Sequence, residues 1–310
     1  MFEFDYPSAN AGSTVYAFRM EPQTKPRAVV QLAHGMAERI SRYFDFARFL
    51  ASQGFVVVGN DHLGHGKTKA SNEDYGYFGL VQPKNLLVED MHTLTVMSHE
   101  QFPDLPYFML GHSMGSFLLR EYITIYGGEL SGAIIMGTGN PSATTVSLGL
   151  GAARLIASLR GDRYRSRFIA NLVDGSYNKQ IRDAHTPHDW ISTVRSVVEK
   201  YEKDVSTGFK FTMNGFEHMF INLLYISSKR TFERTPSSLP LLLISGKQDP
   251  VGGYGKQVAE VAARYEKAGV EDVTTILYPE DRHEVLNEAN KEEVYADILR
   301  WIEQYVSKSV

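Results

Sequence analysis

The sequence predicts an α/β fold in which a mostly parallel sheet is flanked by helices and carries an inserted helical cap. Apolar runs of strand length alternate with amphipathic helical patterns, and one long stretch breaks this alternation. Runs that are apolar along their whole length indicate strands buried on both faces, as in parallel sheets covered by helices. A Gly-His-Ser-Met-Gly motif at 111–115 connects an apolar run to a helical pattern, which fits the same architecture.

The predicted strands are short apolar or alternating runs bounded by turn residues. In chain order they cover residues 2–6, 14–20, 28–33, 55–58, 107–110, 133–136, 241–244 and 273–277. The first two form a hairpin, because the turn-rich residues 8–13 join them. The predicted helices repeat apolar residues every three to four positions. They cover residues 44–54, 86–102, 116–126, 258–265 and 292–306.

The stretch from 139 to 238 interrupts the alternation of strands and helices. It contains helical patterns but no continuous apolar strand. Turn residues bound it on both sides, at 137–141 and at 236–240. The sequence therefore predicts a core of residues 1–138 and 239–310, with a helical cap of residues 139–238 inserted between the two parts.

Composition narrows the classes of function. The net charge is −4 and the Lys and Arg residues are scattered, which argues against nucleic-acid binding. The chain has no cysteine, so disulfides, thiolate catalysis and cysteine metal sites are excluded. The first residues do not resemble a signal peptide, and no stretch has the length of a membrane span. We therefore expect a cytoplasmic location; the sequence does not indicate the oligomeric state.

Ser113 is the predicted catalytic nucleophile. It stands at the centre of a G-x-S-x-G motif between a predicted strand and a predicted helix, where a sharp turn exposes the hydroxyl. Serine needs a base to take its proton, and the base is usually a histidine oriented by a carboxylate. In folds of this kind the acid and then the histidine follow the serine in the chain.

His283 and Asp249 are the predicted base and acid. His283 is the one histidine beyond the predicted cap, and it follows the strand 273–277. Asp249 follows the strand 241–244. The segment between Asp249 and His283 is long enough for one helix and one strand. The rival acids are less suitable. Asp272 precedes its strand, and Glu280 and Asp281 share the loop of the histidine.

An oxyanion hole requires two backbone N–H donors. We expect one from Met114, the residue after the nucleophile, and one from Met36, in the loop after the strand 28–33. His34 precedes that loop, and we interpret it as a structural histidine bonded to neighbouring backbone. The methionine side chains are free to line an acyl pocket.

At these residues the sequence resembles the monoacylglycerol lipase and lysophospholipase family of α/β-hydrolases. The resemblance covers about 28–136 and 241–310, and the motifs that carry it lie at 34–43, 60–66, 111–115, 246–252 and 282–284. Segments at 189–192, 208–209 and 214–216 are similar to bacterial lysophospholipases. The resemblance implies an α/β-hydrolase fold and a monoacylglycerol or lysophospholipid substrate, with apolar cap residues around the acyl chain.

Two other patterns in the sequence point elsewhere. Residues 64–68 end like a phosphate-binding loop, but Asp61 stands where that motif needs its first glycine. His62 and His65, with His34 and Asp61 nearby, have a spacing that suits a metal. The resemblance explains them as a turn beside the site, so we expect no metal and no cofactor.

The apolar residues Leu150, Leu155 and Ile156 of the cap are predicted to bind substrate. They lie near Arg154 and Arg160, as in an amphipathic lid helix that faces an acyl chain or touches a membrane surface transiently. An ordinary cap helix packed on the core explains the same stripe equally well.

The sequence thus predicts a serine carboxylic-ester hydrolase acting on monoacylglycerols or lysophospholipids through an acyl-enzyme on Ser113. A small lipid or ester is the expected partner. The alternatives are an aminopeptidase-type or short-chain carboxylesterase activity on the same fold, and a non-catalytic ligand-binding protein on a hydrolase scaffold.

Overall fold

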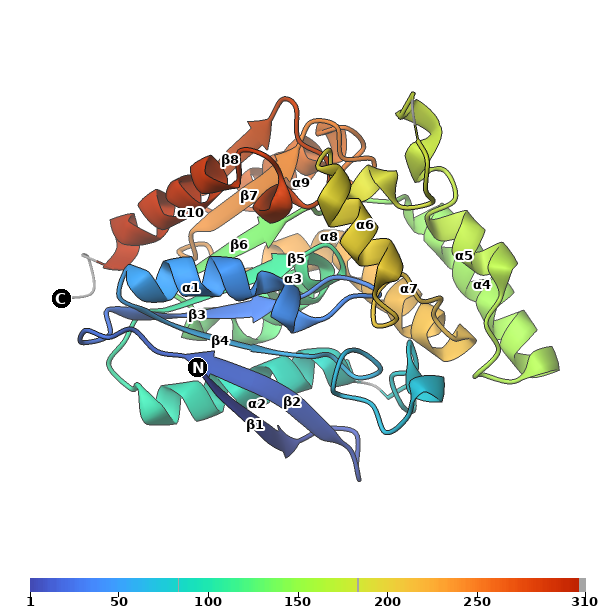
Figure 1. Cartoon of the computed structure of the whole chain (residues 1–310), viewed down its shortest axis with the longest axis horizontal. Coiled ribbons are helices and arrows are strands. Elements are labelled where there is room, and N and C mark those ends of the chain that lie inside the picture. The colour runs from blue at the N-terminus through green and yellow to red at the C-terminus, as the bar shows by residue number, and fades with distance from the viewer. Residues whose placement is uncertain (83, 183, 307–310) are drawn as a thin grey trace.

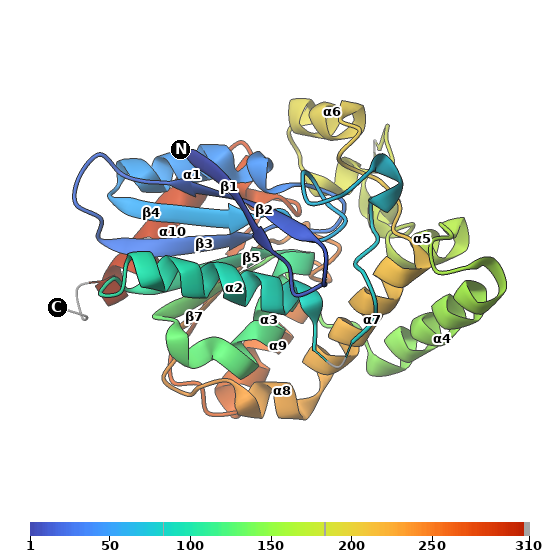
Figure 2. The same ribbon diagram turned by 90° about the horizontal axis from the view of Figure 1, so that it is seen from below.

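The computed structural model describes residues 1–82, 84–182 and 184–306, which form an eight-stranded sheet between two layers of helices (Figures 1 and 2). The strand order is β1-β2-β4-β3-β5-β6-β7-β8. The strands are β1 (Phe2–Pro7), β2 (Thr14–Met20), β3 (Ala28–Ala33), β4 (Phe55–Asn60), β5 (Tyr107–His112), β6 (Gly132–Met136), β7 (Leu241–Gly246) and β8 (Val273–Tyr278). Each predicted strand is present, and several extend one or two residues further than predicted.

The sheet is mostly parallel, as predicted. β1 and β2 form an antiparallel hairpin, β2 pairs antiparallel with β4, and the strands from β4 to β8 in the sheet order run parallel. Every residue of β3 is buried, because helices cover both faces of the strand. Gln31 is its one polar residue. Its amide donates to the carbonyl of Met91 and accepts from the hydroxyls of Thr95 and Tyr107, so burial leaves it satisfied.

Helices α1 (Phe44–Ser52) and α10 (Lys291–Val306) cover one face of the sheet, and α2 (Leu86–Gln101), α3 (Met114–Tyr126) and α9 (Lys256–Lys267) cover the other (Figures 1 and 2). Each face buries its own apolar cluster. Phe46 and Ile298 belong to the first, and Met91, Leu119 and Val261 to the second. Short 3-10 helices lie at Ile40–Tyr43, Asn72–Asp74, Gly127–Glu129, Tyr177–Gln180, Asp189–Ile191 and Val285–Asn287.

Between β6 and β7 the chain forms helices and no strand among its described residues. These are α4 (Ala143–Arg160), α5 (Arg167–Val173), α6 (Arg195–Lys203), α7 (Met213–Ser227) and α8 (Lys229–Arg234). Helix α7 packs on α3 and α4 packs on α7, at the end of the molecule toward which the parallel strands point (Figure 1). We call these helices and their connecting loops the cap. They fall within the predicted insertion, whose limits as a domain stay a prediction.

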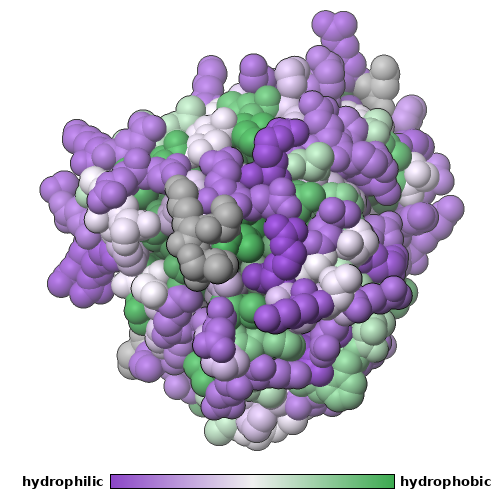
Figure 3. All heavy atoms as spheres, turned by 90° about the vertical axis from the view of Figure 1, so that its left-hand side faces the viewer, coloured by the Kyte–Doolittle hydropathy of each residue, from purple (hydrophilic) through white to green (hydrophobic). Residues whose placement is uncertain are grey.

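Exposed apolar side chains lie on the cap and, in smaller patches, on the face opposite it (Figure 3). Hydrophilic side chains cover most of the face opposite the cap, with smaller apolar patches among them (Figure 3). The cap exposes Leu148, Leu155 and Leu159 on α4 and Phe168 and Leu172 on α5. Within the described ranges, none of the helices is long and apolar enough to cross a bilayer.

Arg120 joins core helix α3 to the start of the cap and to helix α7. Its side chain is fully buried, and its guanidinium donates to the carbonyls of Gly139 at 2.8 Å and Ile226 at 3.2 Å. A third bond, of 3.3 Å, reaches the hydroxyl of Thr138. Thr138 and Gly139 follow β6, where the chain leaves the core, and Ile226 lies near the end of α7, so one side chain ties two segments of the cap region to α3.

We expect Arg120→Met to lower the free energy of unfolding by roughly 3 kcal/mol, because it leaves buried carbonyls without a donor. Urea denaturation measures this difference. Arg154→Met is the control, since Arg154 is largely exposed and forms a surface pair with Glu217. That variant should lose less than about 1 kcal/mol. Equal stabilities of the two variants would contradict the role of Arg120.

Candidate active site

Ser113 lies on a sharp turn between β5 and α3, with φ of 54° and ψ of −119°. Such a backbone conformation costs a non-glycine residue about 1–3 kcal/mol. Glycines on either side make the turn possible. A Cβ on Gly111 would lie 2.3 Å from the carbonyl oxygen of Gly115, and one on Gly115 would lie 2.2 Å from that of Ala33. The chain segments thus approach too closely for a side chain at either position.

Asp249 and His283 meet at the carboxyl ends of the parallel neighbours β7 and β8. His283 Nδ1 lies 2.9 Å from Asp249 Oδ2. Asp249 is fully buried and also accepts from the backbone N–H of Val251 at 2.8 Å and the hydroxyl of Ser245 at 3.1 Å, which fixes the carboxylate. His283 Nε2 is buried and has no hydrogen-bond partner among the described residues. His283 and Ser113 line the same cavity.

The electrostatic surroundings of His283 favour its protonated form. Burial of the ring lowers its pKa, but the charge of Asp249 and the hydrogen bond to it more than offset this effect. The carboxylates of Glu284 and Glu38 act in the same direction. The net result is a pKa of His283 above its ordinary value.

The rival acids bond elsewhere. Asp272 lies just before β8, at the opposite end of that strand from His283, and accepts from the Tyr305 hydroxyl at 2.6 Å. Glu280 is exposed and bonds to Gln248. Asp281 is buried, and burial raises its pKa to about 6. Among the described residues, Asp249 is the one of these four acids that is hydrogen-bonded to the imidazole of His283.

His34 orients the peptide that precedes Met36. Its Nδ1 donates to the carbonyl of Gly35 at 2.8 Å, and its Nε2 accepts from the N–H of His62 at 3.0 Å, so both bonds require one neutral tautomer. Burial lowers the pKa of His34, which agrees with that neutral form. In a trans peptide the N–H points away from the C=O, so the N–H of Met36 points away from His34. A Cβ on Gly35 would lie 3.1 Å from the Cβ of Ser113, so this loop contacts the serine turn.

Sequence reasoning missed a buried ionic network beside this loop. Glu38 Oε1 accepts from the N–H of Gly35 at 2.6 Å and from the Tyr43 hydroxyl at 2.7 Å. Arg42 donates to Glu38 Oε2 at 2.6 Å and to both carboxylate oxygens of Glu284 at 2.7 Å each. Burial opposes the charge of Glu38, but Arg42 holds the pKa of Glu38 well below its usual range. The spacing of Glu38 and Arg42 was visible in the sequence, whereas their contact with the distant Glu284 appears only in the fold.

A cavity of about 510 Å³ lies between the cap and the ends of the strands. Gly35, Met36, Ser113, Met114 and His283 line it from the core. Its apolar wall includes Phe117, Ala170, Val173, Trp190, Ile191, Phe209, Phe211, Phe216 and Met219. Its polar side chains include Asn171, Asp174, Asn178, His188 and Lys210. An apolar cavity with a few polar groups is typical of a small-molecule site.

The predicted substrate-binding residues Leu150, Leu155 and Ile156 do not line this cavity. Helix α4 turns the side with Leu150 toward α7, and Leu155 is 62% exposed. Helix α7 lies between α4 and the core, so α7 supplies Phe216 and Met219 to the wall instead (Figure 2). The concentration of phenylalanines over 209–220 is the signal that could have identified this wall.

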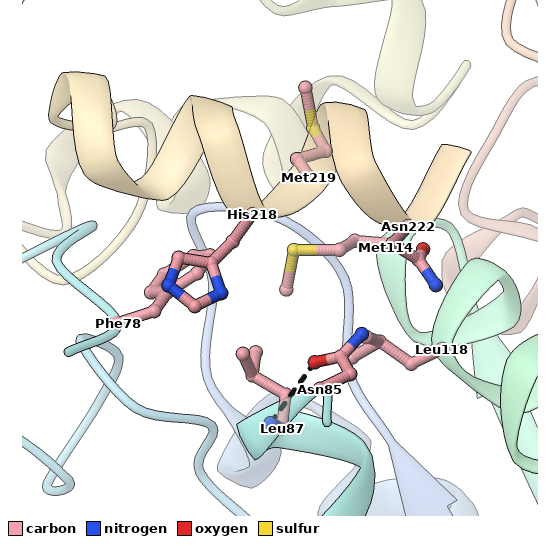
Figure 4. Close-up of a pocket in the computed structure, with 8 residues that line it drawn as sticks. All are labelled: Phe78, Asn85, Leu87, Met114, Leu118, His218, Met219 and Asn222. Carbon is pink, nitrogen blue, oxygen red and sulfur yellow. Dashed lines mark hydrogen bonds between the residues drawn. The ribbon is translucent and has the colours of Figure 1, made fainter. Parts of the chain in front are cut away.

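A second, much smaller pocket adjoins the cavity at Met114 and Met219 (Figure 4). Its volume is about 10 Å³, which is room for one water molecule. His218 and Asn222 of α7 face Asn85 across it, and Asn85 caps the start of α2 (Figure 4). The two methionine side chains therefore form the part of the cavity wall that borders this small recess.

Of the two histidines in the turn at 60–66, His65 bonds to neighbouring backbone through both ring nitrogens, whereas the buried ring nitrogens of His62 have no hydrogen-bond partner among the described residues. His65 Nε2 accepts from the N–H of Ala37 at 3.2 Å, and its Nδ1 donates to the carbonyl of Leu63 at 2.9 Å. Burial lowers the pKa of His65 to about 3, so its ring is neutral. In the part of the chain that the structure describes, no group of three or more His, Asp or Glu side chains is arranged to hold a metal ion.

A family model and one of the relatives below match this chain over most of its length, and another matches it over less than half. A family model described as Hydrolase_4: Serine aminopeptidase, S33, matches residues 24–290. A monoacylglycerol lipase of Mycolicibacterium smegmatis is 31% identical over 284 residues, which cover 91% of this chain and 90% of that protein. Human monoglyceride lipase is 26% identical over 144 residues, or 43% of each chain.

Solved structures share the whole architecture. The structure of a highly thermostable carboxyl esterase from Bacillus coagulans in complex with glycerol has a TM-score of 0.92 and 32% identity, and covers 98% of both chains. A structure described as the open form of a lipase has a TM-score of 0.88 and 25% identity, and covers 98% of this chain and 99% of the other. The chain belongs to the Hydrolase_4 (serine aminopeptidase, S33) family, and it is a carboxylic-ester hydrolase with the α/β-hydrolase fold, related to monoacylglycerol lipases.

Proposed function

We propose that the protein hydrolyses monoacylglycerols through an acyl-enzyme on Ser113, with His283 as the base and Asp249 as its orienting acid. One observation carries the proposal. The buried His283 ring is bonded to a fixed carboxylate through Nδ1, while its Nε2 has no partner among the described residues in a cavity that Ser113 also lines. A base that accepts the serine proton needs such an arrangement.

In the proposed reaction the Ser113 hydroxyl oxygen attacks the acyl carbonyl while His283 Nε2 takes its proton. The tetrahedral intermediate then collapses, and the imidazolium of His283 gives that proton to the leaving alcohol. Water repeats the sequence and releases the fatty acid. Asp249 accepts from His283 Nδ1–H throughout, which keeps the tautomer with a free Nε2 and stabilises the imidazolium.

The N–H groups of Met36 and Met114 are the proposed donors to the oxyanion. Met114 is the first residue of helix α3, where backbone N–H groups have no partner within the helix. The N–H of Met36 is turned away from His34 by the bond between His34 and Gly35. Both residues line the cavity beside Ser113, which supports their role.

The composition of the cavity supports a monoacylglycerol. Its phenylalanines and methionines suit an acyl chain, and its asparagines suit the hydroxyls of glycerol. The relatives named monoacylglycerol lipase agree with this choice. A lysophospholipid is the second candidate, because the cation of Lys210 at the cavity wall suits a phosphate.

Peptidase activity fits the site less well. An aminopeptidase needs a free carboxylate for the α-ammonium group of its substrate, but Arg42 engages both Glu38 and Glu284. Asp174 remains in the cavity, and burial raises its pKa, which weakens it as an anchor for a cation. A short-chain ester would leave much of the cavity empty. A non-catalytic role would not explain why a buried carboxylate, Asp249, orients the buried ring of His283 in the cavity.

Transient contact of the cap with a membrane surface is the proposed route to a lipid substrate. Helices α4 and α5 expose leucines and a phenylalanine beside several arginines, a combination that suits an anionic lipid surface. A cytoplasmic location also remains a proposal, which cell fractionation tests.

Ser113→Ala should lower ester turnover about a millionfold, because the nucleophile is lost. A fluorophosphonate probe should label the unmodified protein and leave this variant unlabelled. Ser116→Ala is the matched control. It removes a neighbouring hydroxyl that bonds to the carbonyl of Ser113 and leaves the nucleophile in place, so the probe should still label it. Normal turnover by the Ser113→Ala variant would exclude the proposed nucleophile.

The pH dependence of kcat/KM should follow the protonation of His283. Its pKa is raised, and only the neutral ring accepts the serine proton, so kcat/KM should rise with pH through a midpoint above 6.5. Asp249→Asn removes the charge that raises this pKa, so the midpoint should move to lower pH and the rate should fall by about 10⁴. A midpoint that stays in place in that variant would contradict the pairing.

A panel of substrates separates the alternatives. We expect the highest kcat/KM on monoacylglycerols, lower values on lysophosphatidylcholine and on short p-nitrophenyl esters, and none on aminoacyl amides. Lys210→Gln should lower activity on the lysophospholipid alone, since only that substrate carries a phosphate. Highest activity on aminoacyl amides would reject the proposed substrate class.

The double variant Leu155→Ser, Leu159→Ser should sediment less with anionic vesicles, because two exposed apolar side chains are lost from α4. Its turnover of a soluble short ester should not change. Ile125→Ser removes an exposed apolar residue of core helix α3 and serves as the control. Unchanged vesicle binding by the double variant would show that this face of the cap is not the membrane-contacting surface.

A further inference from the structure

Ala37, in the loop that carries the proposed oxyanion donor Met36, has a backbone conformation that its neighbours must hold. Its φ is 52°, in the left-handed region that a residue with a Cβ rarely adopts. Both of its backbone polar groups are bonded. The N–H donates to His65 Nε2 at 3.2 Å, and the carbonyl accepts two hydrogen bonds.

The two donors to the Ala37 carbonyl come from the cap. One is the backbone N–H of Gly208, at 2.9 Å, and the other is the hydroxyl of Tyr201 in α6, at 3.1 Å. Tyr201 is buried, so water competes little for its hydroxyl. A further contact joins the same regions, because Arg39 forms an ion pair with Asp204 just after α6. The cap therefore holds the oxyanion loop directly.

The amide of Met36 lies between two fixed points. On its amino-terminal side, the N–H of Gly35 is bonded to Glu38 and the carbonyl of Gly35 to His34. On its carboxyl-terminal side, the carbonyl of Ala37 is held by the cap. Loss of the second point would let the strained Ala37 relax, and the resulting shift of Met36 would change the position of its N–H relative to Ser113.

The ring of Tyr201 also contacts the network on the base side of the site. The guanidinium of Arg42 lies over this ring, 5.0 Å from its centroid, and the same guanidinium binds Glu284 next to His283. One side chain of the cap thus touches both the oxyanion loop and the residue that anchors the loop of the base.

We propose that Tyr201 is a positioning residue through which the seating of the cap sets the geometry of the oxyanion hole. The cap then does more than select the substrate, since catalysis requires it to be in place against Ala37. This inference rests on the proposed function, because it assumes that the N–H of Met36 binds the oxyanion.

The test is Tyr201→Phe, which removes the hydroxyl and keeps the ring over Arg42. On a short soluble ester, kcat should fall about tenfold, the effect of one lost hydrogen bond in the transition state, while KM stays the same. The affinity for a trifluoromethyl ketone should fall by the same factor, because its adduct with Ser113 places an oxyanion in the same hole. The melting temperature of each variant establishes that it is folded.

Tyr225→Phe is the matched control. Its hydroxyl also joins the cap to the core, at 2.8 Å from Thr124, but on α7 and away from the cavity. Its kcat and inhibitor affinity should equal those of the unmodified protein. An unchanged kcat in Tyr201→Phe, a rise in KM alone, or an equal loss in Tyr225→Phe would each overturn the inference. If Ser113→Ala retained activity, the proposed function would fail first, so the two failures are distinguishable.

Discussion

The close approach of helix α3 to the ends of β3 and β5 is the constraint on which the site depends. Gly111 and Gly115 leave no room for a Cβ, so the helix begins directly against the loop after β3. This contact brings the first N–H of the helix, the serine and the loop at Met36 to one place. The strained backbone of Ser113 persists because the buried helix around it is packed and cannot move to relieve it.

Buried polar groups orient this site in two different ways. His34 and His65 are neutral and each uses both ring nitrogens, so each holds two backbone groups at fixed angles. Glu38, Arg42 and Glu284 are charged and bonded to one another. A buried ion pair adds little net stability, since desolvation offsets the attraction. The network is therefore better understood as a means of fixing two loops than as a source of stability.

The parts of the structure with local signals were predictable from sequence. The parallel strands are continuous apolar runs, and the G-x-S-x-G motif carries its own backbone requirement at Ser113. The structure brings Asp249 and His283 together as expected, because their strands are neighbours; their catalytic roles stay a proposal. Family membership and ester hydrolysis, which the resemblance implied, agree with the comparisons.

Features that depend on distant contacts were not predictable. The apolar stripe on α4 did not reveal whether it faced a ligand or another helix, and the structure turns Leu150 toward α7. Glu284 lies 242 positions from Arg42, so no spacing rule joins them. The hydrogen bond from Tyr201 to the carbonyl of Ala37 also joins the cap to the core, through residues more than 160 positions apart.

The position of the cap between β6 and β7 has a consequence for chain entropy. These strands are parallel neighbours, so the cap is an enlarged crossover of about 100 residues rather than an appendage. Loop-closure entropy grows slowly with length, and a crossover four times longer than usual costs only about 1.2 kcal/mol more. Cap sequences can therefore diverge in length with little loss of core stability.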